Sequence, residues 1–160
     1  MTETLAATRM GQPYAHKPIQ MTGYYKFKPG PKMQDRNGYA IDGETDYPDI
    51  YCIVYRNTDD NNNPIQLDGN LLSDDIKVNP HKDMIVGKGR IKPEDIDISG
   101  SQWKPFSIQI AYTKDISEDD VLDYKYSTAV VFSSSVRGAE FIGAPGSTLW
   151  IDNVKLECAY

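Results

Sequence analysis

Residues 126–157 read YSTAVVFSSSVRGAEFIGAPGSTLWIDNVKLE, which is the pattern of two strands joined by a long loop. Tyr126 to Ser134 and Ser147 to Glu157 are rich in β-branched and aromatic residues, which fit a pleated, half-buried surface. The loop contains GAEFIGAPG, whose three glycines permit backbone angles that other residues avoid. We therefore predict a strand at each end of this stretch.

The second of these strands changes the parity of its hydrophobic residues. Leu149 and Ile151 fall on one face, whereas Val154 and Leu156 fall on the other, because side chains alternate along a strand. Keeping all four in a core requires one extra residue near the Asp-Asn pair at 152–153. The sequence therefore predicts a β-bulge, with one side chain of this pair turned inward to satisfy the freed backbone groups or a cation.

Four further stretches have strand composition and end at turn signals. They are Ile19 to Lys28, Asp49 to Arg56, Met84 to Ile91 and Trp103 to Tyr112. The second of them reads DIYCIVYR and carries apolar residues on both faces, so we expect both of its faces to be covered.

The only helix signal lies at Ser117 to Tyr124, where Ser117 is placed to cap the first turn and Asp120 follows three residues later. Short strands without long intervening helices favour an all-β fold, an antiparallel β-sandwich. With 160 residues, a single domain over 1–160 is expected, its first ten residues flexible. The predicted core is Ile50, Cys52, Val54, Phe106, Ile108, Ile110, Val130, Phe132, Leu149 and Ile151.

Composition excludes several classes of partner. The chain has 17 basic and 23 acidic residues, a net charge of −6, so we expect no nucleic acid partner. No apolar run approaches the ~18 residues that a spanning helix needs, so we expect no transmembrane segment. Cys52 and Cys158 are too few for a disulfide framework and leave a single bridge between them open.

The sequence contains none of the familiar nucleophile, phosphate-loop or zinc-protease motifs. A pair of carboxylates, however, is sufficient for glycoside hydrolysis. Asp49 and Asp152 fall in strand or bulge contexts, and Glu140 falls in the glycine-rich loop, so these three are the candidate catalytic residues. The alternative is that each only accepts hydrogen bonds from nearby backbone or tyrosine groups.

Acidic residues also gather in two short runs. Carboxylates at this density can hold calcium, although charge runs more often form solvated faces. The runs are Asp42, Glu44, Asp46 and Asp49, and then Asp115, Glu118, Asp119, Asp120 and Asp123.

Aromatic usage is the most unusual feature of the composition, with eleven Tyr, four Phe and two Trp. Sugars present apolar C–H faces that stack on aromatic rings, and hydroxyl groups that need polar partners. A ligand-binding face of this mixed kind is predicted from Tyr24, Tyr51, Tyr55, Trp103 and Gln109. The alternative is that most of these tyrosines pack in the core.

Three stretches together resemble the putative carbohydrate metabolism domain family. They are TGYYKFKPG at 22–30, DIYCIVYR at 49–56 and FSSSVRGAEFIGAPGSTLWIDNVKLE at 132–157, with RMGQPYAHKP at 9–18 as a weaker upstream match. The closing LWIDNVKLE is also similar to the last strand of many jelly-roll carbohydrate-binding modules.

The resemblance implies a jelly roll, a glycan-related role and a bacterial exported protein, at the cell surface or in the periplasm. Such modules often hold a structural calcium near the closing strand, which implies Asp152 as a metal ligand. In the family, further strands precede the segment similar to 9–18, so we expect part of the family's sheet to lie outside this sequence. Other domains of a longer polypeptide are also expected as partners.

Three functions follow as alternatives. The first is non-catalytic binding of a glycan or oligosaccharide, the second is a glycoside hydrolase, and the third is a structural adhesion or assembly domain. The residues favour binding, because no reactive nucleophile and no single acid/base pair stands out.

Overall fold

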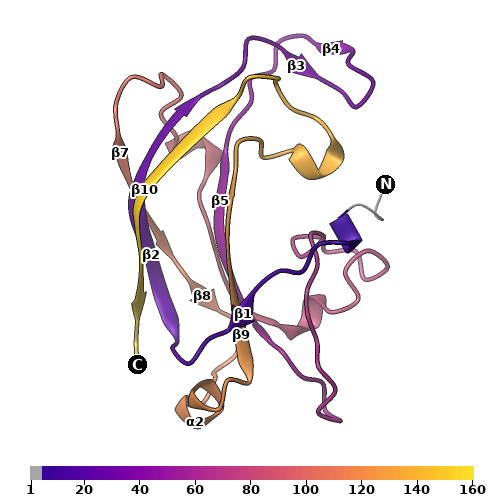
Figure 1. Cartoon of the computed structure of the whole chain (residues 1–160), viewed down its shortest axis with the longest axis vertical. Coiled ribbons are helices and arrows are strands. Elements are labelled where there is room, and N and C mark those ends of the chain that lie inside the picture. Colours follow the sequence, from indigo (N-terminus) through magenta and orange to yellow (C-terminus); the bar gives the residue numbers. More distant parts are fainter. Residues whose placement is uncertain (1–4) are drawn as a thin grey trace.

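Two antiparallel sheets pack face to face in the computed structural model, which describes residues 5–160 (Figure 1). Within these residues one sheet has five strands and the other has three. The all-β sandwich is therefore confirmed, while the jelly-roll subtype stays a prediction. In spatial order the larger sheet contains β1 (Gln12–Pro13), β9 (Tyr126–Ser133), β5 (Asp49–Arg56), β6 (Ile85–Arg90) and β8 (Ala111–Tyr112), and the smaller contains β10 (Thr148–Cys158), β2 (Pro18–Lys28) and β7 (Lys104–Gln109).

Short elements connect and cap these sheets. They are the hairpin of β3 (Met33–Gln34) with β4 (Ala40–Ile41), the helix α2 (Glu118–Leu122), and the 3-10 turns η1 (Lys82–Met84), η2 (Pro93–Asp95) and η3 (Gly138–Glu140). Among the described residues, no helix is both long and apolar enough to cross a bilayer.

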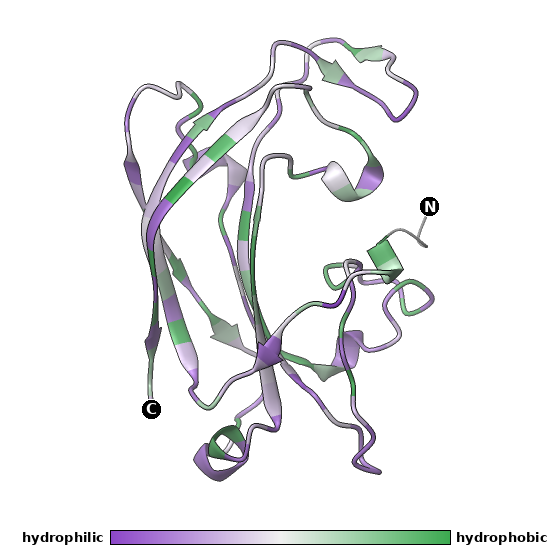
Figure 2. Ribbon diagram, viewed as in Figure 1, coloured by the Kyte–Doolittle hydropathy of each residue, from purple (hydrophilic) through white to green (hydrophobic). Residues whose placement is uncertain are grey.

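The main core lies between the two sheets. Buried and more exposed residues alternate along β2, so that Met21, Tyr25 and Phe27 face inward. Figure 2 shows hydrophobic residues, in green, along the strands of both sheets. Of the predicted core residues, six are buried and three pack partly buried against them. The six are Ile50, Cys52, Val54, Phe106, Ile108 and Ile110, and the three are Val130, Leu149 and Ile151.

Phe132 is the one predicted core residue that the structure places elsewhere, since it is 37% exposed. It pairs with the buried Ile50 on one side of β9. On the other side, β1 pairs only with Ser127 and Thr128, so β9 is a sheet edge at Phe132. The prediction was wrong because alternation identifies the face of a strand but not the edge of a sheet.

A second cluster of buried residues covers the opposite face of the larger sheet. Tyr51, Ile53 and Tyr55 of β5 pack there against Leu67 and Leu71 of the long connection between β5 and β6. Both faces of β5 are therefore covered, as DIYCIVYR predicts.

The predicted bulge in β10 is present. Asp152 pairs with Tyr24 and Lys155 with Thr22, so two residues of β10 lie opposite the single residue between them on β2. The first of the two, Asn153, has a φ of 55°, the left-handed conformation that the first residue of a G1-type bulge adopts and that most residues avoid. Because of the extra residue, the hydrophobic side chain of β10 beyond the bulge faces the core despite the parity change.

The side chains at the bulge lie differently from the prediction. Val154 is exposed, so three rather than four hydrophobic residues of β10 pack on the core. Asp152 and Asn153 are also exposed, and within residues 5–160 neither side chain makes a hydrogen bond to the freed backbone groups. The expectation that one of them turns inward was wrong, because both residues are exposed.

The predicted strand from Trp103 to Tyr112 divides between the two sheets. β7 ends at Gln109 in the smaller sheet, and β8 begins at Ala111 in the larger one. At the crossing point, Ile110 N donates to Ile19 O at 2.9 Å and its side chain stays in the core. A strand that changes sheet in this way closes a corner of the sandwich.

The predicted helix is α2, and its cap sits as expected. The Ser117 hydroxyl accepts a hydrogen bond from Asp120 N at 3.2 Å. Ser117→Ala leaves this amide unpaired, so we expect it to lower the free energy of unfolding by about 1 kcal/mol in urea denaturation. Ser117→Asn keeps an acceptor and serves as the control; equal losses in both variants would contradict a capping role.

Candidate functional site

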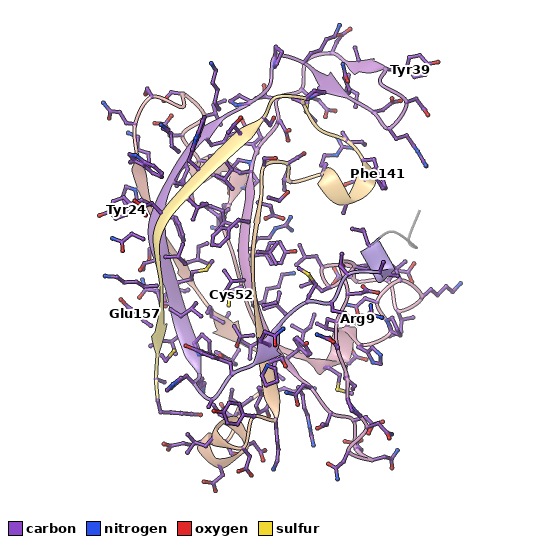
Figure 3. The ribbon with its side chains drawn as sticks, in the orientation of Figure 1. Arg9, Tyr24, Tyr39, Cys52, Phe141 and Glu157 are labelled. Carbon is purple, nitrogen blue, oxygen red and sulfur yellow. The ribbon has the colours of Figure 1, made fainter. Side chains whose placement is uncertain are left out.

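The outer face of the smaller sheet carries three exposed aromatic residues. Tyr24 on β2, Trp103 just before β7 and Trp150 on β10 are 46%, 45% and 38% exposed. Figure 3 shows Tyr24 projecting away from the sandwich. Lys26 lies between the two tryptophans, with its Nζ 5.5 Å from the Trp103 ring centroid and 4.7 Å from that of Trp150. We call Tyr24, Lys26, Trp103 and Trp150 the aromatic platform.

Polar side chains continue this face along the same three strands. Gln20 pairs with Gln109 across β2 and β7, and the Gln20 amide donates to the Ser107 hydroxyl. On the other side of β2, Asp152 lies opposite Tyr24. The structure thus brings together Tyr24, Trp103 and Gln109 of the predicted ligand-binding face, and their role as ligand contacts stays a prediction.

The other two tyrosines of the predicted face lie elsewhere. Tyr51 and Tyr55 are only 6% and 1% exposed and belong to the second buried cluster, on the far side of the larger sheet. The Tyr55 hydroxyl donates to Met10 O at 2.8 Å. Assigning both to one face with Tyr24 was wrong, because parity within a strand does not say which sheet the strand joins.

Two members of the platform, Trp150 and Lys26, were not among the residues predicted from the sequence. Trp150 shares the outward parity of Asp152, and this parity was the available signal. Lys26 gave no signal of its own, because its position beside both tryptophans depends on the register of three strands.

A cleft of about 1150 Å³ opens on the opposite side of the molecule, over the larger sheet. Its floor is formed by strand residues, and its walls by the loop that contains η3, by the N-terminal segment and by the connection after β5. In Figure 3, Phe141 lies on the η3 side and Arg9 on the N-terminal side. The floor residues are Asp49, Tyr51, Arg90, Val131 and Ser133.

A bidentate ion pair lies at this floor. Arg90 Nε donates to Asp49 Oδ1 and Arg90 Nη2 to Asp49 Oδ2, both at 2.8 Å. The Asp49 side chain is 7% exposed, whereas that of Arg90 is 36% exposed. The hydrogen bond to Asp49 is the main cause that raises the pKa of Arg90. The pair is therefore fixed in geometry while its guanidinium faces the cleft.

Tyr51 lies beside this pair, because it is the cross-strand neighbour of Arg90. Burial, followed by the charge of Asp49, raises the pKa of Tyr51 to about 12. The hydroxyl is therefore protonated at neutral pH and can both donate and accept a hydrogen bond.

The three candidate catalytic carboxylates do not form one site. Asp49 and Glu140 both line the cleft, whereas Asp152 lies on the outer face of the other sheet. Glu140 accepts a hydrogen bond from Arg137 Nη2 at 3.2 Å. Both candidate carboxylates of the cleft, Asp49 and Glu140, are thus paired with a guanidinium group.

Asp46 is the most buried carboxylate, at 1% exposure, and it holds the loop between β9 and β10 in place. Its Oδ1 accepts from Tyr47 N and from the Ser135 hydroxyl, and its Oδ2 accepts from Ala144 N and from the Ser147 hydroxyl, all at 2.8–3.0 Å. This loop forms one wall of the cleft. The sequence marked Asp46 only as part of an acidic run.

Among residues 5–160, the side chains of the two acidic runs do not gather into a metal-ligand cluster, and calcium at either run stays a prediction. In the described part of the chain, no three His, Cys, Asp or Glu side chains gather where they can hold a metal ion. In the first run Glu44 pairs with Arg137, and in the second Asp120 pairs with Lys125. The calcium expected at Asp152 also stays a prediction.

Both cysteines, which lie in the described residues, are free thiols. Burial raises the pKa of Cys52 to about 12, so its thiol behaves as a small core residue. The bridge that the sequence left open is absent from the structure.

Fold and surfaces together define a β-sandwich with a mixed aromatic and polar face and a separate cleft. Residues 1–157 match the family model of the putative carbohydrate metabolism domain, and the chain belongs to this family. The family predicted from the three sequence stretches is therefore confirmed.

Two solved structures from Bacteroides share the fold. One is described as a putative glycoside hydrolase from Bacteroides thetaiotaomicron VPI-5482, with 33% identity, a TM-score of 0.81, and coverage of 98% of this chain and 42% of that one. The other is described as a putative glycoside hydrolase from Bacteroides vulgatus ATCC 8482, with 32% identity, a TM-score of 0.79, and coverage of 96% and 57%. The chain thus spans about half the length of these proteins. No curated protein sequence matches it.

Proposed function

We propose that this domain binds a glycan through the aromatic platform without cleaving it. The observation that carries the proposal is the exposure of Tyr24, Trp103 and Trp150 on one sheet face, with the polar side chains of Asp152 opposite Tyr24 and of Gln109 farther along the same face. Membership in a carbohydrate metabolism family supports a sugar as the ligand.

The platform suits a sugar chain for three reasons. Aromatic faces stack on the C–H faces of pyranose rings, while neighbouring amide and carboxylate groups accept and donate hydrogen bonds to hydroxyl groups. Lys26 interacts with both tryptophan rings, which limits their rotamers before a ligand arrives. Tyr24 and Trp150 lie on paired strands and Trp103 directly precedes a third, so little ordering cost remains for binding.

Cleavage is the alternative, because Asp49 and Glu140 line the same cleft. Hydrolysis of a glycosidic bond requires one carboxyl group that donates a proton to the leaving oxygen. Here Arg90 and Arg137 hold the two carboxylates in ion pairs. This arrangement favours binding over turnover, and an adhesion or assembly role remains the third alternative.

A glycan array combined with a reducing-sugar assay tests these functions. We expect binding without release of reducing ends. Trp103→Ala and Trp150→Ala each remove a stacking ring, so affinity falls about 2- to 10-fold per variant. Tyr39→Ala, which removes an exposed tyrosine of the β3–β4 hairpin, is the matched control and leaves affinity unchanged.

Release of reducing ends by the wild-type protein would support the hydrolase. Neither glycan binding nor release of reducing ends would support the adhesion role. Binding that is equally strong in both tryptophan variants would show that the glycan binds elsewhere. We also propose an exported protein, at the cell surface or in the periplasm, in which this domain works beside others.

A further inference from the structure

The cleft over the larger sheet contains polar groups whose hydrogen-bonding capacity is not used within the protein. Two of the five N–H groups of Arg90 donate to Asp49, and the other three N–H groups have no hydrogen-bond partner in residues 5–160. The Tyr51 hydroxyl likewise has no hydrogen-bond partner in that part of the chain, although Tyr51 is 6% exposed.

The hydroxyl of Tyr51 must therefore open into the cleft. Among the described residues, no side-chain nitrogen or oxygen is both fully buried and without a hydrogen-bond partner. An unpartnered hydroxyl on a buried tyrosine that lines the cleft is thus accessible only from the cleft. Buried polar groups are normally paired, so a free one in a cavity indicates a ligand or ordered water.

Charge around the cleft indicates what kind of ligand fits. Two guanidinium groups, of Arg36 and Arg90, and three carboxylates, of Asp35, Asp49 and Glu140, line the cleft. With no excess of positive charge, the cleft gives an anion no net attraction. Asp49 neutralises Arg90 while holding its guanidinium plane, so the floor offers directed donors without net charge.

The walls supply apolar contact beside these donors. Leu72, Val78, Val131 and Ile142 line the cleft together with the floor residues. A volume of about 1150 Å³ exceeds what a single sugar ring fills and admits a short oligosaccharide. Apolar walls and a floor of adjacent donors and acceptors match a pyranose ring, which has apolar faces and hydroxyl groups at its rim.

We propose that the cleft is a second sugar site, separate from the aromatic platform, in which Arg90 and the Tyr51 hydroxyl bind adjacent hydroxyl groups of a neutral sugar. Tyr51 and Arg90 are cross-strand neighbours, with Cβ atoms about 4.5–5.5 Å apart. They can therefore reach two hydroxyl groups of the same ring. Asp49 acts as a positioning residue that keeps the guanidinium flat against the floor.

NMR titration with two matched probes tests this proposal. Methyl β-glucoside and disaccharides built from it are neutral, whereas methyl β-glucuronide differs from the first by a carboxylate. We expect the neutral probes to shift the backbone amide signals of Tyr51, Arg90 and Val131 to saturation. The glucuronide should bind no more tightly than the glucoside. Tighter binding of the glucuronide, or no shift at these amides with any neutral probe, would overturn the proposal.

Two conservative variants separate ligand binding from folding. Tyr51→Phe removes a hydroxyl that has no partner in residues 5–160, so we expect an unchanged thermal midpoint and a 2- to 10-fold loss of affinity, about that of one neutral hydrogen bond. Arg90→Lys keeps a positive charge beside Asp49 but loses the planar donors, with a loss of about tenfold or more. Unchanged affinity in both variants would contradict the assignment.

Trp103→Ala distinguishes this site from the proposed platform. If the cleft is independent, this variant leaves the shifts at Tyr51 and Arg90 intact. A protein that binds only in the cleft would contradict the platform and keep the present inference, and one that binds only at the platform would do the reverse.

Discussion

Replacement of Asp46 by alanine is expected to lower the free energy of unfolding by about 3–4 kcal/mol, because four hydrogen-bond donors lose their acceptor at a fully buried position. Two of these donors are backbone amides, which cannot turn to find another partner. Urea denaturation measures the change directly. We expect an intermediate loss for Asp46→Asn, because an amide keeps only one acceptor oxygen.

Asp42→Ala is the matched control, since Asp42 is an exposed aspartate four residues away, without a hydrogen bond or ion pair in the described residues. We expect its effect to stay within about 0.5 kcal/mol. Equal stability of the two alanine variants would show that Asp46 does not hold the loop. Hydrogen exchange should also speed up at Ala144 in Asp46→Ala, since its amide donates to the Asp46 carboxylate.

Tyr55→Ala is expected to have the largest effect among the tyrosines, about 3–5 kcal/mol, because the ring is fully buried and its removal leaves a cavity. The Tyr55 hydroxyl also ties down the N-terminal segment through Met10 O. Next to it, Gly11 has a φ of 88°, and an added Cβ there would lie 2.8 Å from the Tyr55 ring. The Tyr55 ring and the segment around Gly11 therefore pack closely, so that loss of the ring also removes support for this segment.

Tyr24→Ala provides the comparison for Tyr55→Ala. Tyr24 is half exposed on the platform and makes no side-chain hydrogen bond within residues 5–160, so we expect at most about 1 kcal/mol of destabilisation. Thermal melts of the two variants, measured side by side, test the division of the tyrosines into buried and ligand-accessible classes. Similar midpoints would mean that this division is wrong.

Local pattern was sufficient for the longer strands, the helix α2 and most of the core, but not for the short strands β1, β3 and β4. Alternation in DIYCIVYR predicted that β5 is covered on both faces, and the change of parity after Ile151 predicted the bulge at Asn153. The capping pattern at Ser117 predicted α2. These features follow from the order of residue types within short segments, which a sequence shows directly.

The assembly of surfaces depended on strand order and register, which alternation does not contain. Tyr24, Trp103 and Tyr51 have similar strand contexts, yet the first two share the outer face of one sheet and the third lies at the floor of a cleft over the other. The chain passes from β7 to β8 through Ile110, and this change of sheet sets which faces meet.

Long-range pairing also decided the roles of the acidic residues. Asp46 and Asp49 look equivalent in the sequence. Asp46, however, accepts hydrogen bonds from a loop about a hundred residues away, whereas Asp49 on β5 pairs with Arg90 on the neighbouring strand β6. The amino-acid pattern was thus enough for the sandwich, its bulge and its family. The platform and the cleft were decided only by the tertiary structure, because their residues come from strands that become neighbours when the two sheets form.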